Sequence, residues 1–287
     1  MTRGRIELQD SEANLRGSTE VEAVLIIKRD FDAVLQELTN LRSILTYKLE
    51  PGPSRTIRDR YFDTSDRRLR KRGANLRIRE IDGSFFISVK THARRTLRGA
   101  VARREVEAPW SRQMLLSLVK DLELEGDLAL TDRQFSDTAP IAAIEAIGLQ
   151  LVQDRETKRE VRNIRSEVKP NLVLAELAID QVTYHIGSGN ISIFELEVEE
   201  KARGSSSVIR DVTNALLHAY RPSVQKWSHG KFVTGLAIQR LLETEPADIL
   251  VEQGRLKPEA FDRIDQSVRS TTKSLGRRLI RTLTSQR

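Results

Sequence analysis

Hydrophobic and polar residues alternate along several short segments of the chain, a pattern that predicts half-buried β-strands. Eight segments show it: 18–27, 56–64, 74–81, 84–90, 100–108, 158–165, 172–180 and 191–200. Turns containing Gly73, Gly83 and Gly99 separate neighbouring segments closely, which favours an antiparallel meander over parallel strands joined by helices. We therefore expect an α+β protein with mainly antiparallel strands, and eight strands are enough to close a barrel.

Other segments repeat their apolar residues every three or four positions, which predicts helices. They cover 31–45, 111–124, 207–220 and 231–243. We expect a flexible polar N-terminus over 1–17, a barrel domain covered by helices over 18–245, and a helical C-terminal extension over 246–287. Beyond Asp265 this extension carries only basic charges.

Charged residues share one face of several predicted strands. The sets are Glu20 and Glu22; Arg77 and Arg79; Arg103, Glu105 and Glu107; Glu176 and Asp180; and Glu195, Glu197 and Glu199. Apolar residues occupy the opposite faces, and if they pack outward under the helices, the charged faces line the inside of a barrel. The alternative is a set of solvated faces whose opposite charges pair across the sheet.

The spacing of these charges indicates the ligands that they fit. Side chains two apart on a strand are separated by roughly 6.5–7 Å, so one Glu-x-Glu pair cannot clamp a small ion alone. Two such pairs on neighbouring strands can bring four carboxylates onto a hard divalent cation, Mg²⁺ or Mn²⁺. The arginine guanidinium donates two parallel hydrogen bonds to phosphate oxygens and stays charged at any working pH. Acidic and basic strands around one lumen would therefore fit a metal–polyphosphate complex.

Composition narrows the classes of function. The 287 residues include 48 Lys and Arg against 41 Asp and Glu, a net charge of +7. This balance favours a polyanionic partner: nucleic acid, an anionic membrane surface or a phosphate-rich small molecule. The absence of cysteine excludes disulfides, thiol catalysis and zinc–thiolate sites, and it fits a cytoplasmic location. We expect no transmembrane helix and no signal peptide, because no sufficiently long apolar run occurs.

Several ordered motifs resemble the CYTH superfamily, also called triphosphate tunnel metalloenzymes. The strongest is "YFDTSDRRLRKRGANLRIRE" (61–80), which is similar to the family's Tyr-Phe-Asp-Thr…Leu-Arg-x-Arg block. "SVK" ending at Lys90, "RREVE" (103–107), "LAELAID" (174–180) and "FELEVEE" (194–200) follow in the family's order. "QKWSHG" (225–230) resembles a weakened Ser-Lys-Tyr-x-Arg signal that keeps Lys226. The superfamily includes class IV adenylate cyclases, thiamine triphosphatases and inorganic triphosphatases.

The resemblance implies an eight-stranded antiparallel tunnel barrel and a role for each charged set. The residues that would hold the phosphate chain are Arg77, Arg79, Lys90, Arg159 and Lys226. The metal, Mg²⁺ or Mn²⁺, would be bound by Glu20, Glu22, Glu195 and Glu197. Further catalytic carboxylates lining the tunnel would be Glu105, Glu107 and Asp180. Val24 stands where the family's Glu-x-Glu-x-Lys signature has lysine, which removes one cation from the expected tunnel.

The function expected from this resemblance is metal-dependent hydrolysis of a phosphoanhydride in a short triphosphate, with inorganic triphosphate as the best single substrate. The alternatives are a non-catalytic polyphosphate- or nucleotide-binding module, which the absent lysine supports, and a class IV-type adenylate cyclase. The partner is thus a triphosphate-containing small molecule. A homodimer and a contact between nucleic acid and the basic C-terminal helix remain open.

Overall fold

The computed structural model describes residues 21–91, 94–95, 101–102, 105–122, 124 and 139–284, with the backbone alone at 91, 94–95, 101–102, 105 and 272–284. These residues fall into two compact units. Unit 1 contains Ile57–Asp154, and unit 2 contains Val21–Thr56 and the chain from Arg155 onward. The chain passes between the units within the strands β4 (Arg55–Asp63) and β10 (Gln150–Ser166).

Unit 1 is built on an antiparallel ladder in the order β4-β5-β6-β9. Its other elements are β5 (Ala74–Ile81), β6 (Ser84–Thr91), β7 (Arg94–Arg95), β8 (Val101–Ala102), β9 (Glu105–Pro109), α2 (Arg68–Lys71), α3 (Arg112–Asp121) and α4 (Pro140–Ala146). Buried Leu115 and Leu118 of α3 pack with Leu76 and Ile87 of the ladder. The apolar spacing of 111–124 therefore reflects a helix that covers one face of this sheet.

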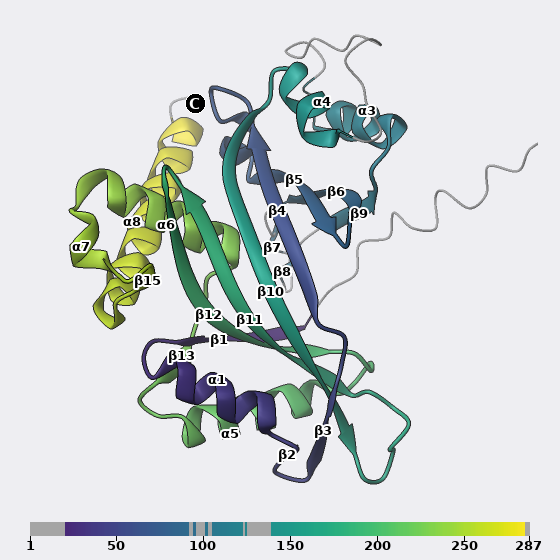
Figure 1. Ribbon diagram of the computed structural model, residues 1–287. Helices are drawn as coiled ribbons and strands as arrows, with labels where there is room; N and C mark the ends of the chain where they lie inside the picture. The colour runs from purple at the N-terminus through teal and green to yellow at the C-terminus, as the bar shows by residue number, and fades with distance from the viewer. Residues whose placement is uncertain are drawn as a thin grey trace, which may run out of the picture. The chain divides into compact units, whose positions relative to one another are not determined.

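Unit 2 contains a second antiparallel ladder in the order β13-β1-β12-β11-β10. The strands are β1 (Glu22–Ile27), β2 (Ser43–Ile44), β3 (Tyr47–Pro51), β11 (Ala175–Ile186), β12 (Gly189–Glu200), β13 (Val224–Lys226), β14 (Val251–Glu252) and β15 (Arg255–Leu256). The helices are α1 (Phe31–Asn40), α5 (Ser206–Ala219), α6 (Lys231–Thr244), α7 (Ala247–Leu250) and α8 (Pro258–Thr284) (Figure 1).

The predicted fold class is confirmed, since both ladders are antiparallel and helices accompany each of them. The eight predicted strands correspond to β1, β4, β5, β6, β9, β10, β11 and β12. One helix is shorter than predicted: α1 ends at Asn40, and residues 43–44 form a hairpin with β3 instead of a continuing helix. Leu41 takes an extended conformation, because the chain turns there into this hairpin.

The two faces of the unit 2 sheet pack against different helices. One face buries Leu25, Leu196 and Leu177 against α1 and α5 (Figure 1). The other face buries Ile26 and Tyr184 against α6 and α8. The predicted outward packing under helices thus applies to the first face, while the face that carries the acidic residues also becomes apolar where α6 and α8 cover it.

This arrangement explains the change of character along the first strand. Glu22, Val24 and Ile26 share a face, and exposure falls along them until Ile26 is completely buried. Val24 and Ile26 pack with the cluster formed by α6 and α8. Glu20 lies outside the described residues, as does the predicted flexible segment 1–17.

The predicted extension 246–287 begins with α7, continues through the β14–β15 hairpin and ends in α8. Ala260, Phe261 and Ile264 of α8 are buried against α6 and the sheet of unit 2. In the part of the chain that the structure describes, none of the helices is both long enough and apolar enough to cross a lipid bilayer.

Asp63, within the Tyr-Phe-Asp-Thr motif, has a structural role in unit 1. Its buried carboxylate accepts hydrogen bonds from three backbone N–H groups: Thr64 at 2.8 Å and Leu69 at 2.9 Å on Oδ1, and Arg70 at 3.1 Å on Oδ2. A charged acceptor satisfies such donors better than a neutral one. Asp63 therefore fixes the turn that leads from β4 into α2.

We predict that Asp63→Asn lowers the free energy of unfolding by about 2 kcal/mol, because an amide can accept at only one of its two polar atoms. Urea unfolding at neutral pH measures the change. Asp82→Asn is the matched control, since Asp82 lies in an exposed turn and its substitution should change stability little. An equal loss in the two variants would contradict a specific role for Asp63.

Candidate functional site

Acidic residues of β1, β12 and β11 lie beside one another in rows across the unit 2 sheet. The antiparallel register places three residues in each row: Glu22, Glu199 and Glu176; then Val24, Glu197 and Ala178; then Ile26, Glu195 and Asp180. Residues opposite one another on antiparallel strands project from the same face. One face of three strands therefore carries a graded acidic surface, exposed at Glu22 and buried at Asp180.

Lys231, the first residue of α6, neutralises the buried end of this surface. Its Nζ lies 2.9 Å from Glu195 Oε2 and 3.1 Å from Asp180 Oδ2, and it donates a hydrogen bond to Glu197. Only 10% of the lysine side chain is exposed. The sequence did not single out Lys231, although a lysine at a helix N-terminus opposes the helix dipole and is a local signal of a tertiary requirement.

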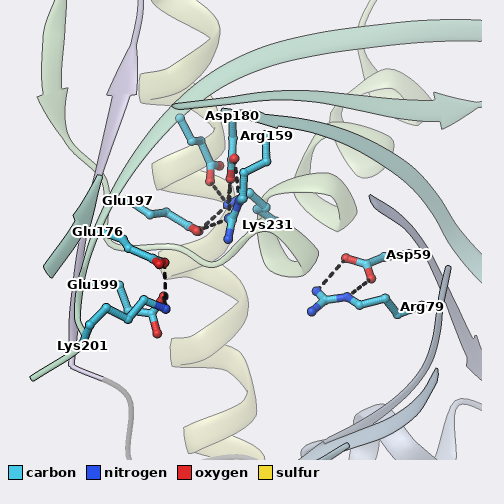
Figure 2. A network of polar contacts seen from close by, with 10 residues as sticks. Asp59, Arg79, Arg159, Glu176, Asp180, Glu197, Glu199, Lys201 and Lys231 are labelled. Carbon is cyan, nitrogen blue, oxygen red and sulfur yellow. Dashed lines mark hydrogen bonds and ion pairs between the residues drawn. The ribbon is translucent and has the colours of Figure 1, made fainter. Parts of the chain in front are cut away.

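Arg159 of β10 completes the group. Its Nε and Nη2 donate to the two oxygens of Asp180 at 2.8 and 2.6 Å, and Nη2 also donates to Glu197. Figure 2 shows the side chains of Arg159 and Lys231 converging between Asp180 and Glu197. We call the five residues Arg159, Asp180, Glu195, Glu197 and Lys231 the Lys231 cluster. It brings together four of the predicted site residues and one that was not predicted.

The electrostatics of the cluster follow from its burial and its two cations. Burial raises the pKa of Glu195, which Lys231 only partly offsets. Burial also acts to raise the pKa of Glu197, but Lys231 and Arg159 outweigh it and bring this pKa to about 2. Burial acts to lower the pKa of Lys231, yet the attraction of the three carboxylates raises it overall. Lys231 and Glu197 are therefore both charged at neutral pH.

A second charged group, Lys201 with Glu176 and Glu199, lies at the more exposed end of the same face. Lys201 Nζ is 2.8 Å from Glu176 Oε2 and 3.0 Å from Glu199 Oε2 (Figure 2). Glu22 lies directly opposite Glu199, two rows away from Glu195. The predicted metal ligands Glu22 and Glu195 are thus separated by roughly 13 Å along the strand.

The donor chemistry of this face fits a hard divalent cation. Glu195 Oε1 is buried and has no hydrogen-bond partner among the described residues, and an unpaired buried carboxylate oxygen is stabilised by a cation. Within the same residues, however, no three acidic or histidine side chains form a ready-made metal site. The carboxylates of the Lys231 cluster are paired with protein cations instead.

Unit 1 holds the predicted arginine pair in place with an aspartate that was not predicted. Asp59 is almost completely buried and accepts from Arg79 Nε at 2.8 Å and Nη2 at 3.2 Å (Figure 2). Arg77 donates from Nε to Ser88 Oγ at 2.9 Å and from Nη2 to Glu107 Oε2 at 2.6 Å. Asp59 lies opposite Arg79 in the β4–β5 ladder. Only the register of these two strands shows that Asp59 is the partner of Arg79.

The other predicted site residues lie at these positions. Lys90 of β6 is opposite Glu105 of β9 in the ladder of unit 1, and the Glu105 side chain is outside the described part. Lys226 is exposed and lies opposite Leu25, so it projects from the face that packs on α1 and α5. Lys226 therefore does not join the Lys231 cluster, and the lysine five residues later contacts the carboxylates.

We predict that Lys231→Met lowers the free energy of unfolding by about 3–5 kcal/mol at neutral pH, because Asp180, Glu195 and Glu197 then have one neighbouring cation instead of two. In the native protein the stabilisation from Glu197 is present above pH 4.5 and is lost as the pH falls toward 2. The difference between Lys231→Met and the native protein should therefore shrink in acid. Denaturant unfolding at several pH values measures it.

Lys226→Met is the control for this experiment, since it removes an exposed lysine of the same segment. Its stability should stay close to that of the native protein at every pH. A loss for Lys231→Met that is the same at pH 3 and pH 7 would contradict the assignment of the charges.

Two solved structures are similar to this chain over most of its length. A protein from Hippeastrum, described as a candidate adenylyl cyclase with a dominant triphosphatase activity, is 17% identical with a TM-score of 0.47, over 79% of this chain and 98% of its own. A candidate adenylate cyclase from Bacillus halodurans is 20% identical with a TM-score of 0.44, over 75% of this chain and 96% of its own. No curated protein matches the sequence.

The CYTH domain model matches residues 20–226 of the sequence. This range covers most of the chain. It includes β1, the strands β5 and β10 that carry the predicted site arginines, and the acidic strands β11 and β12. Proteins of this family bind triphosphate substrates and use divalent metal ions. The chain belongs to the CYTH domain family.

Proposed function

We propose that this protein is a divalent-metal-dependent hydrolase that cleaves the terminal phosphoanhydride of a short triphosphate, with inorganic triphosphate as the substrate. Water oxygen attacks the terminal phosphorus, the bond to the bridging oxygen breaks, and pyrophosphate leaves as orthophosphate forms. The water proton passes to the phosphate products or to solvent. The products are thus one pyrophosphate and one orthophosphate per triphosphate.

The Lys231 cluster is the observation that carries this proposal. Asp180 and Glu195 are almost fully buried and the other three charged groups are largely shielded from water, which is unfavourable relative to an apolar core of the same size. A cluster like this one is therefore a candidate functional site. Arg159 and Lys231 are cations that phosphate oxygens can share with the carboxylates. The membership in a family that binds triphosphates favours the same reading.

The charged residues of unit 2 have separable roles in this mechanism. Arg159 and Lys231 would bind phosphate oxygens and neutralise the charge that develops on the leaving group. Asp180 holds both nitrogens of Arg159 and so orients it. Glu195 and Glu197 are the described residues that would hold a metal ion, whereas Glu22, two rows away from Glu195, is too distant along the strand to bind the same ion. When bound, Mg²⁺ or Mn²⁺ would supply Lewis-acid polarisation of phosphate oxygens.

In unit 1 the arginines are the candidate phosphate ligands, with Lys90 as a further cation. Asp59 fixes the Arg79 guanidinium in a bidentate pair, so its remaining N–H groups have a defined direction. Glu107 accepts a hydrogen bond from Arg77 through one oxygen only. We assign Glu107 to orienting Arg77 and keep Glu105 as the candidate carboxylate that orients the attacking water.

A non-catalytic polyphosphate-binding module is the second candidate function. One observation favours it: the carboxylates of the Lys231 cluster already have protein cations as partners, and the described residues offer no ready-made metal site. Such a module would bind triphosphate through its cations without turnover. A homodimer and a nucleic-acid contact through 246–287 stay predictions.

Incubation of the purified protein with inorganic triphosphate and Mg²⁺ or Mn²⁺ tests the proposal. We expect equal amounts of orthophosphate and pyrophosphate, and removal of the metal by a chelator should abolish their release. Arg79→Lys should lower kcat/KM by about 100-fold, because lysine cannot reproduce the forked contact with phosphate. The control Lys71→Met removes an exposed cation of unit 1 and should change kcat/KM less than about twofold.

Three other outcomes separate the rival functions. Cyclic AMP formed from ATP would identify a cyclase. Calorimetric binding of triphosphate without phosphate release would favour the binding module. Absence of phosphate release from inorganic triphosphate, thiamine triphosphate and nucleoside triphosphates would refute the proposed hydrolase activity.

We further predict that Val24→Lys changes kcat/KM by less than about threefold. Val24 lies directly opposite Glu197, and this carboxylate already contacts Lys231 and Arg159. A new lysine ammonium beside Glu197 would therefore find the negative charge of this carboxylate already neutralised. Val24→Met controls for side-chain size, and steady-state kinetics with inorganic triphosphate provide the measurement. A gain of tenfold or more with Lys alone would mean that the native site lacks a needed cation.

A further inference from the structure

The short segment that carries Lys231 into the acidic cluster connects β13 to α6. We call residues 227–231 the Lys231 loop. They lie beyond the part of the chain that matches the CYTH domain model, which ends at residue 226. The position of the Lys231 ammonium depends on this loop, because Lys231 is both its last residue and the first residue of α6.

Both ends of the loop are fixed by the sheet and by α6. The Trp227 backbone N–H donates to the Val24 carbonyl at 2.9 Å, which continues the pairing of β13 with β1. The Trp227 indole donates to Thr234 Oγ1 at 3.0 Å, and the buried Tyr184 hydroxyl donates to the Lys231 carbonyl at 2.8 Å. The N-cap residue of α6 is Gly230, which has no side chain that could cap the helix.

The middle of the loop is held by α8. His229 Nε2 lies 2.8 Å from Asp265 Oδ1, and Arg269 Nε lies 2.8 Å from the other oxygen of this aspartate. The Trp227 ring contacts His229 and Phe261 edge-on, with ring centroids 5.0 and 5.8 Å apart. The extension thus contributes a polar and an aromatic contact to a loop that the CYTH match does not include.

From these contacts we infer that α8 is a positioning element for Lys231, acting through the Asp265–His229 pair. The inference rests on the proposed function for its kinetic consequence. Lys231 has to meet three carboxylates at once, so a small displacement of its loop weakens several contacts together. A positioned cation that moves by about 1 Å loses much of its interaction with substrate. Asp265 and His229 are positioning residues and do not touch the cluster themselves.

The C-terminal extension therefore has a role within unit 2 that its basic charge does not reveal. Its buried residues Phe261 and Ile264 anchor the helix, and Asp265 on the next turn reaches the loop. Arg240 of α6 donates to Thr271 of α8, which ties the two helices together further along. Helix α8 thus contacts both the loop and the helix that together present Lys231.

Asp265→Asn tests the inference in the full-length protein, with Asp262→Asn as the matched control. Asp262 lies on the same helix, three residues earlier, but pairs with Lys28 and is largely exposed. The first measurement is acetylation of Lys231 by acetic anhydride, quantified by mass spectrometry. The second is the separation of KM and kcat for inorganic triphosphate.

We expect Asp265→Asn to increase the rate of Lys231 acetylation by about tenfold, since the amine becomes accessible when the loop is released. KM should rise about fivefold, because the bound phosphate loses a correctly placed cation, and kcat should fall as well, because Lys231 neutralises charge on the leaving group. A purely structural effect would lower kcat alone, through the fraction of folded enzyme, and would leave KM unchanged. Asp265→Glu should restore the native acetylation rate and the native KM, and Asp262→Asn should leave the acetylation rate and KM unchanged.

His229→Gln is the second variant, and it decides the question if Asp265→Asn does not fold. When both fold, the double variant should show the same acetylation rate as either single variant, because one contact is removed in each case. Acetylation and KM that stay at native values in a folded variant would overturn the inference, as would additive effects. Absence of phosphate release by the native protein would refute the proposed function alone, since acetylation still reports on the loop.

Discussion

The ion pairing of Lys231 with three carboxylates of the sheet, two of them buried, is the constraint on which the rest of unit 2 depends. Charges removed from water are unfavourable by several kcal/mol each unless opposite charges and hydrogen bonds meet them. Asp180 and Glu195 are almost fully buried, so the register of β11 with β12 and the start of α6 have to place their oxygens around one ammonium. A slip of one residue would turn both carboxylates into the apolar layer under α1 and α5.

The same constraint explains why the acidic face is graded. At its exposed end Glu22 and Glu199 lie opposite each other, and Lys201 contacts Glu199. At its buried end the face meets the apolar cluster beneath α6 and α8, so each carboxylate there needs a protein cation. Helix α8 closes this end by packing on α6 and by contacting the loop before Lys231. The extension and the charged site are therefore parts of one packed structure.

In unit 1 the buried charge is a cation, and it is compensated by acceptors from neighbouring strands. Arg77 is 3% exposed, and a buried guanidinium needs acceptors in its plane. Ser88 and Glu107 provide them for Arg77, while Asp59 accepts from Arg79 in a forked pair. Both arginines are thus held in fixed orientations before any ligand arrives, which reduces the ordering that binding requires.

The sequence by itself determined the fold class, the eight strands and the faces that carry charge. Successive side chains of a strand point to opposite faces whatever the strand packs against, so the alternation can be recognised without the tertiary structure. It also placed Arg77, Arg79, Asp180 and the acidic strand β12 in the family's motifs, and the resemblance implied a role for Arg159. Only the tertiary structure decided which charges meet. Lys231 lies 34 residues from Glu197 along the chain, and Asp59 lies 20 residues from Arg79, so no local pattern connects them. Lys226 matched a motif, yet its side chain projects from the other face, because strand parity and not sequence proximity sets its direction.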